Sequence, residues 1–562
     1  MTRRTTFVAA LLTAGCVLAS AGYARTQVNP TAPPATNPPV TPTPSGAPTP
    51  TPLTTGVPAP LGSFSPSPSP SPTATPTPPP ILVQPPAAQV AVGATQTLHV
   101  SSVLGQMKVT VLNPAIVDAA VDQTAETVTL TGKAPGATAL GITDQRGVNA
   151  VVPVRVAYTA GSIADSASIR VTGDPANPMF VKRQAVAAAV AAAQARAGAQ
   201  IVASTDEVQF SEALAQDSVA TVDVPMLIQG EQYFSVEGTT HVRVENMAAP
   251  KITPDSLTVS DYPERLEENG VLFATDLKRD APTRFLYFHY NPPGQPDRRI
   301  VLRAQNESNE PAIVQFISGE GGPDPNEMLA GHVATYAFLR RLVQNEGSVI
   351  VIPGNGTLNL VEQPLPAKNV VCNLLQLRVF NGSTVHLTLF AQDASSSPDE
   401  SLASTELLSG GHPHARGVYK IPEFHYSTLW NVTDPYLELQ IGHIPLPNLL
   451  QGQALSGDYG VLQSYVIKIQ NPTRQPQPIA IYENPHGGRA TGTYLIDGTL
   501  IQSHQVPPFS RYKVRQYVVP ALGFVRVTIE TIPDSGSSYP LRLVFAPDDG
   551  SVAPGAPGSP IY

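Results

Sequence analysis

The chain has 562 residues, and its 60 prolines are about twice the usual share of that residue. Of these prolines, 22 lie within residues 30–86, and no Asp, Glu, Lys or Arg occurs between Thr26 and Met107. This excludes one globular unit of full length and leaves about 450 residues for several folded domains. The 34 Lys and Arg against 43 Asp and Glu give a net charge of −9 with no basic stretch, so nucleic acid is not an expected partner.

The N-terminus has the composition of an export signal. A basic start, Met-Thr-Arg-Arg, is followed by a short apolar run and by small residues suited to cleavage. This pattern predicts a signal peptide over residues 1–24 and a protein that is exported, whether periplasmic, cell-surface or extracellular. The run is too short to favour a permanent span, so we expect no transmembrane helix in the mature chain. Cys16 ends a Leu-Thr-Ala-Gly-Cys stretch similar to a bacterial lipoprotein box, which makes it a candidate lipid anchor.

Residues 25–87 are rich in Pro, Thr and Ser. Such a segment cannot bury apolar surface and favours extended polyproline conformations, so it is predicted to be a disordered linker. It serves either as a stalk with a defined reach or as simple spacing. A short disordered tail is expected at residues 551–562.

Residues 88–158 contain short β-branched runs about ten residues apart, separated by Gly, Asn-Pro and Asp, which predicts a small β-sandwich. Three stretches carry a family resemblance: residues 113–118 (Asn-Pro-Ala-Ile-Val-Asp), 128–138 (with Gly132 and Gly136) and 144–147 (Asp-Gln-Arg-Gly). Their order resembles the N-terminal domain of pilus-assembly secretins, with bacterial Ig-like repeats as the competing match. The resemblance implies a link to pilus or secretion machinery.

Residues 164–250 are predicted to form a small α+β domain. Asn177-Pro178 begins a helix by the N-cap and N1 preferences, and an Ala-rich run continues it to residue 197, before Gly198. A strand is expected on each side of this helix, followed by a hairpin over residues 233–244.

Residues 251–398 and 399–550 are predicted to be two related β-sandwich modules, here called the first and the second module. The strand and turn of residues 300–311 align with those of residues 465–476, each with a Gln-Asn pair followed by Pro. This alignment favours duplication, while a chance likeness of two β-rich segments is the alternative.

The predicted modules also end alike, at Leu389-Phe390 and Val544-Phe545. We expect these phenylalanines to be equivalent and each module to have its own core. The first module is predicted to contain an extra helix over residues 326–344. The pair weakly resembles an uncharacterised family of exported bacterial β-rich proteins.

The histidines concentrate in one region, where His412-Pro-His414 follows two glycines and is followed by His425 and His443. Imidazoles at this spacing predict a metal site formed by His412, His414 and His425, with His443 as another candidate third ligand. An ordinary surface loop is the other interpretation. Cys372 lies alone in an apolar run and is expected to be a small core residue.

The fold class predicted from these patterns is mainly β and multidomain, with Ig-like sandwich modules, a small α+β domain and a disordered Pro-rich linker. No catalytic motif is recognisable, and no cofactor is expected. We therefore expect an exported structural or binding protein of the cell envelope or surface, whose protein or polysaccharide partner is not identified, with a pilus or secretion link. One alternative is a metal-dependent extracellular enzyme that uses the histidines. Another is an outer-membrane secretin-like pore subunit, because residues 442–450 resemble the signature of secretin channel domains.

Overall fold

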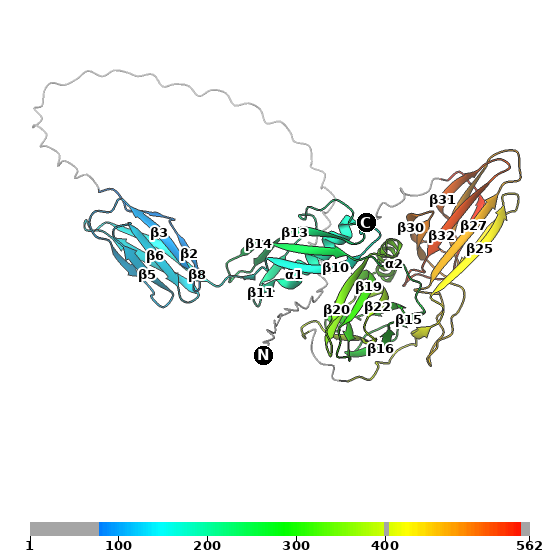
Figure 1. The fold of residues 1–562 in the computed structure, drawn as a ribbon, viewed down its shortest axis with the longest axis horizontal. Coiled ribbons are helices and arrows are strands. Elements are labelled where there is room, and N and C mark those ends of the chain that lie inside the picture. The colour runs from blue at the N-terminus through cyan, green and yellow to red at the C-terminus, as the bar shows by residue number, and fades with distance from the viewer. Residues whose placement is uncertain (1–77, 398–403, 552–562) are drawn as a thin grey trace, which may run out of the picture. The chain divides into compact units, whose positions relative to one another are not determined.

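The computed structural model describes residues 78–397 and 404–551 (Figure 1). The predicted signal peptide, Cys16, most of the predicted linker and residues 552–562 of the predicted tail lie outside these residues. The chain divides into two compact units, with the boundary between Tyr158 and Thr159. The described residues form 33 strands and two helices, which confirms the mainly β, multidomain prediction.

The unit that ends at Tyr158 is a sandwich of two four-stranded sheets. One sheet has the order β1 (Leu82–Gln84), β3 (Thr95–Ser101), β6 (Thr127–Gly132), β5 (Val117–Asp122), and the other β2 (Ala88–Ala91), β8 (Asn149–Ala157), β7 (Gly136–Thr143), β4 (Lys108–Val111). Side chains alternate between the two faces of each strand, so Leu98, Leu130 and Leu140 meet between the sheets. Ile81 and Val83 are buried in the same core, so this domain begins inside the predicted linker.

Two residues in the stretches that carry the family resemblance, Asp144 and Gly132, stabilise the turns of this sandwich. The Asp144 carboxylate accepts hydrogen bonds from the backbone N–H groups of Leu104 and Arg146 and from Arg146 Nε. Burial alone would raise the pKa of Asp144, but the hydrogen bonds from Arg146 and Leu104 hold it below its ordinary value. At Gly132, a Cβ atom would lie 2.5 Å from the Ala91 carbonyl oxygen, so only glycine fits there.

A ten-stranded sheet runs through the second unit (Figure 1). Its order is β12 (Gln200–Val202), β13 (Ser218–Gln229), β14 (Val236–Asn246), β10 (Ser166–Thr172), β20 (Gly347–Ile352), β19 (Ala312–Asp324), β22 (Val370–Asn381), β17 (Thr283–Tyr290), β15 (Ser256–Ser260), β24 (Arg416–Tyr419). The predicted boundaries at residues 250/251 and 398/399 both run through this sheet, because β10 pairs with β20 and β15 pairs with β24.

The α+β region forms one end of that sheet. Helix α1 (Pro178–Ala192) begins as predicted, because the Asn177 side chain accepts the Met179 N–H and Pro178 stands at N1. The helix ends five residues before its predicted end, since β11 (Gln194–Ala195) leaves it to pair with β9 (Gly161–Ser162). The predicted hairpin over residues 233–244 is wrong: β14 runs straight through this segment and pairs with β13.

The first module is a sandwich. The middle of the ten-stranded sheet faces a four-stranded sheet of order β16 (Gly270–Lys278), β23 (Thr384–Asp393), β18 (Arg298–Gln305), β21 (Thr357–Leu365). Its core lies between them and includes Phe285, Leu302 and Leu375. The predicted extra helix is α2 (Glu327–Val343), capped by the Asn326 side chain.

The second module is also a sandwich. One sheet has the order β25 (Glu423–Asn431), β27 (Leu462–Gln470), β32 (Phe524–Thr531), β29 (Ala490–Ile496), β30 (Thr499–Val506), and the other β26 (Leu437–Ile441), β33 (Leu541–Pro547), β28 (Gln477–Pro485), β31 (Tyr512–Val519). Its core includes Trp430, Ile467 and Phe545. The segment that resembled a secretin channel signature, residues 442–450, lies in the connection between β26 and β27.

A third core joins the two modules. It lies on the other face of the ten-stranded sheet and contains Phe288 and Leu374 of that sheet, Phe338 of α2, and Leu462 and Ile532 of the second module. Because this stretch of sheet is buried on both faces, β22 reads as a nearly continuous apolar run rather than an alternating one. Cys372 lies in this core, as expected, and burial raises its pKa to about 12. The expectation that the modules share few contacts is therefore wrong.

The aligned turns are equivalent in atomic detail. The buried Asn306 side chain donates to the carbonyl oxygens of Glu310 and Pro353, and the buried Asn471 side chain donates to those of Gln475 and Val519. Each asparagine Oδ1 also accepts the backbone N–H and the hydroxyl of the residue two positions on, Ser308 or Thr473. A shared hydrogen-bond pattern of this specificity supports duplication of one module.

The strand pairing extends this equivalence and corrects one detail. Five strands of each module pair in the same way: β18, β19, β20, β21 and β22 correspond in order to β27, β28, β31, β32 and β33. Helix α2 stands where the second module has the β29–β30 hairpin. Phe545 lies on β33, whose counterpart is β22, whereas Phe390 lies on β23. The predicted match of these two phenylalanines is therefore wrong.

Replacing Asn471 by Ala should destabilise the protein by about 2–3 kcal/mol, because the buried Val519 carbonyl and the Gln475 carbonyl would both lose their donor. Asn306→Ala should give a similar loss in the first module. Urea unfolding measures both, with the conservative Thr473→Ser as the control that keeps the hydroxyl. A loss below about 0.5 kcal/mol for both asparagine variants, the range of ordinary surface substitutions, would contradict the assigned role of this turn.

Candidate functional site

The structure places His414 beside two carboxylates. Its Nδ1 lies 3.4 Å from Asp261 Oδ2 and its Nε2 lies 3.0 Å from Glu264 Oε2. Burial raises the pKa of Asp261 to about 6, although its hydrogen bond to His414 acts in the opposite direction. The same hydrogen bond raises the pKa of His414. Ion pairs thus join the loop that precedes β24, which carries His414, to the connection that follows β15, which carries both acids.

The other predicted ligands lie elsewhere. His425 is on β25, where its Nε2 is 3.6 Å from Glu423 Oε2, and His412 is exposed in the loop that precedes β24. His414 and His425 thus have different acidic partners, and His443 follows β26. Within residues 78–397 and 404–551, no three His, Cys, Asp or Glu side chains are grouped so that they could hold a metal ion. A metal site at His412, His414 and His425 stays a prediction.

A fully buried arginine connects the first module to the second. Arg284 on β17 donates from Nη2 to Glu423 Oε1 at 2.9 Å and to Gln376 Oε1 at 3.1 Å. Its Nη1 donates to the carbonyl oxygens of Pro422, at 2.8 Å, and Gly460, at 3.3 Å. The guanidinium therefore donates to groups near the starts of two strands of the second module: Pro422 and Glu423 at β25, and Gly460 just before β27.

A second buried pair joins α2 to the second module. His332 Nδ1 lies 2.6 Å from Asp534 Oδ2, and both side chains are fully buried. Thr491 Oγ1 donates to the same carboxylate oxygen at 2.7 Å, and Gln502 Nε2 lies 2.7 Å from His332 Nε2. The backbones are also in close contact, because a Cβ atom on Gly331 would lie 1.8 Å from the Ser535 carbonyl oxygen.

We call the residues Arg284, His332, Glu423, Gln502 and Asp534 the polar seam. A His–Asp pair is also the arrangement that orients a general base, but here the second imidazole nitrogen meets the Gln502 amide inside the protein. The seam therefore serves to hold the two modules in one geometry. Sequence reasoning missed it, because His332 and Asp534 are 202 residues apart and neither lies in a recognisable motif.

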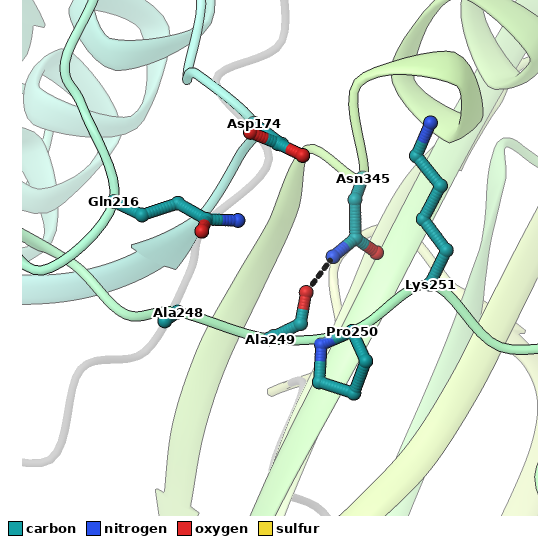
Figure 2. A pocket seen from close by; sticks show the side chains of 7 residues that line it. All are labelled: Asp174, Gln216, Ala248, Ala249, Pro250, Lys251 and Asn345. Carbon is teal, nitrogen blue, oxygen red and sulfur yellow. Dashed lines mark hydrogen bonds between the residues drawn. The ribbon is translucent and has the colours of Figure 1, made fainter.

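A surface hollow lies where the chain passes from β14 into the first module (Figure 2). It is lined by Asp174, Gln216, Ala248, Ala249, Pro250, Lys251 and Asn345. The buried Asn345 side chain donates to the Ala249 carbonyl oxygen at 2.8 Å, which fixes the connecting segment. The lining has one acidic residue, Asp174, and one basic residue, Lys251. The hollow is therefore polar, but it is neither predominantly negative nor predominantly positive.

A comparison with protein families agrees with the sequence analysis for the first sandwich. Residues 84–157 match the family described as "Pilus formation protein N terminal region". The match covers the first sandwich and confirms the resemblance assigned to residues 88–158. No curated protein matches the chain.

Solved structures of β-rich proteins show distant likenesses. They include domains 5–6 of the S-layer protein SbsC (15% identity, 30% of this chain and 97% of that chain, TM-score 0.14) and fibronectin(III)-like modules of Clostridium thermocellum CbhA (14%, 30% and 94%, 0.16). Another is the M60 catalytic domain with two CBM51 domains of Clostridium perfringens ZmpB (8%, 83% and 54%, 0.15). These TM-scores are too low to bear on the fold or the function of this chain. Among the described residues, no helix has the length and apolar character needed to span a membrane.

Replacing Arg284 by Met should destabilise the second unit by about 3–5 kcal/mol, because it leaves the buried Glu423 carboxylate and two carbonyls without their donor. The double variant Arg284→Met with Glu423→Gln should recover part of that loss, since the unpaired charge is then gone. Urea unfolding measures both variants. Equal stability of Arg284→Met and the unsubstituted protein would contradict the role of the seam.

A buried acid makes stability depend on pH. Burial raises the pKa of Glu483 to about 8 from an ordinary 4.5, while the hydroxyls of Ser503 and Tyr494 lower it somewhat. Between these two values the folded state keeps the proton and the unfolded state releases it, so stability falls as the pH rises from about 5 to 8. The expected loss is about 2–4 kcal/mol.

Glu483→Gln should make the fall in unfolding free energy between pH 5 and pH 8 smaller by about 2–4 kcal/mol, while Asp261, whose pKa burial also raises, keeps a smaller part of the dependence. Glu438→Gln is the matched control, because Glu438 lies on the surface strand β26 in an ion pair with Arg542. Urea unfolding at pH 5 and pH 8 provides the measurement. An unchanged pH slope in Glu483→Gln would show that this carboxyl is not the group responsible.

Proposed function

We propose that this chain is an exported structural or binding component of the cell envelope, attached to a pilus or secretion assembly through its first sandwich. The observation that carries the proposal is the match of residues 84–157 to the pilus formation N-terminal region, which coincides with a complete and compact β-sandwich. The predicted signal peptide and the Pro-rich linker that precede this sandwich are consistent with a role outside the cytoplasm.

The use of charge in the second unit supports a structural rather than a catalytic role. Two of its ionic pairs, Arg284 with Glu423 and His332 with Asp534, join the first module to the second. Buried ion pairs contribute little net stability but fix one geometry, because breaking one leaves an unpaired charge. A rigid block that presents fixed surfaces is what an assembly component requires.

The outer surface of the first sandwich offers a place for attachment. Leu112, at the end of β4, is 78% exposed, and Val151, on the outer face of β8, is 69% exposed. Gly132 and Asp144 serve in the turns, whereas Leu112 and Val151 lie outside the core of this sandwich. We infer that recognition of an envelope partner uses this sandwich rather than the second unit.

Deletion of residues 81–157 in the source organism tests the attachment. The shortened chain should be exported and folded, because the second unit has its own cores, but it should no longer co-isolate with envelope complexes, and surface pili or secreted substrates should be reduced. The control replaces the same residues with an unrelated sandwich domain, which preserves spacing. Normal assembly and unchanged co-isolation of the deleted chain would overturn the proposal.

A further inference from the structure

Strand β25 is the outer strand of the second module's larger sheet (Figure 1). It pairs in parallel with β27 over all nine of its residues, from Glu423 opposite Leu462 to Asn431 opposite Gln470. Its other edge has no partner strand among the described residues. The strand is well exposed, with Tyr426 40% and Leu429 53% accessible.

The direction of the backbone groups follows from the two ends of this ladder. The Pro422 carbonyl accepts the Leu462 N–H and the Val432 N–H donates to the Gln470 carbonyl, so even-numbered residues direct both groups toward β27. In a parallel strand the N–H and C=O of one residue point to the same side, and they alternate along the strand. The N–H and C=O groups of His425, Ser427 and Leu429 therefore point away from β27, at the open edge.

Every other outer strand that the structure describes is protected in one of the ways that limit edge pairing. Strands β1, β2, β4, β9, β11, β12, β24 and β26 have five residues or fewer; β5, β16 and β31 each carry two charged residues; β21 contains Pro364; and β30 contacts α2 and β31. Strand β25 has neither Lys, Arg nor Pro, and its one acid, Glu423, is bound to Arg284. A nine-residue edge without protection is the kind of surface that pairs with another strand.

The first module shows how such an edge is completed. There the strand beside β18 is β23, and its outer edge is covered by β16, which pairs with it antiparallel over eight residue pairs. In the second module β25 occupies the place beside β27, and no strand corresponds to β16. The internal repeat therefore indicates that the missing neighbour is an extended strand.

We propose that this neighbour is β25 of a second copy of the chain, paired antiparallel about a two-fold axis at Ser427. In this register Ser427 faces its own copy, His425 faces Leu429, and Glu423 faces Asn431. No like charges are opposed, and the three outward-directed residues form about six backbone hydrogen bonds, two for each hydrogen-bonded pair. The segments of this chain outside the described termini are rich in proline, which lacks the N–H that a pairing strand needs, so they are poor alternatives.

Cysteine crosslinking tests both the partner and the register. The purified full chain carries Cys16→Ser, so that the buried Cys372 is the only other thiol, and receives Ser427→Cys. Opposed residues of a hydrogen-bonded antiparallel pair have Cα atoms about 5.5 Å apart, which suits a disulfide. Under mild oxidation we expect Ser427→Cys to form a covalent dimer.

His425→Cys is the matched control, because it lies on the same edge but about 13 Å or more from its own copy, too far for a disulfide. Alone it should form no covalent dimer, and it should crosslink when mixed with Leu429→Cys. In sedimentation equilibrium the unsubstituted chain should show a concentration-dependent dimer. Ser427→Pro, which removes an N–H that does not bond β27, should weaken association about tenfold or more without lowering Tm by more than a few degrees.

Three results would overturn the proposal. One is a chain that stays monomeric at about 100 μM with no Ser427→Cys crosslink, a concentration at which even a weak specific dimer is populated. Another is equal crosslinking of Ser427→Cys and of His425→Cys alone, which indicates contact without this register. The last is capture of a different envelope protein by Ser427→Cys in the source organism, which assigns the edge to another partner.

Discussion

Burial of the middle of the ten-stranded sheet on both faces is the constraint on which the second unit depends. One face packs against the sheet of β18 and its neighbours, and the other packs against α2 and the second module. A sheet covered on both sides leaves its polar side chains no access to water, so each must find a protein partner. Arg284 on β17 meets that requirement with groups of the second module, and His332 on the covering helix α2 does the same, so the polar seam follows from the burial.

Duplication explains how that arrangement arises. The two modules share the asparagine turn and the pairing order of five strands, but α2 replaces the β29–β30 hairpin at the corresponding place. These two insertions contact each other, through His332 on one side and Thr493 and Gln502 on the other. The modules therefore differ where they meet. A separate difference is that β25 lacks the neighbour that β16 gives to β23.

Much of the local structure could be predicted from sequence, because it depends on short-range rules. The cap at Asn177, the extra helix after residue 326 and the aligned Gln-Asn turns each need only a few neighbouring residues. The predictions that failed concern long-range pairing. Phe390 and Phe545 look alike in sequence, yet their strands pair differently, and the continuous sheet across residue 251 has no local signal. The seam was not predicted for the same reason, since Arg284 and Glu423 are 139 residues apart.

The two modules and their connecting sheet are expected to unfold as one cooperative unit. Trp430 is the chain's one tryptophan and lies in the core of the second module, so its fluorescence reports on that module alone. Amide hydrogen exchange of β17 and β22, followed in the same urea series, reports on the first module. The structure predicts that the two transitions coincide at one midpoint. A loss of Trp430 fluorescence at a clearly lower urea concentration, with β17 and β22 still protected, would contradict it.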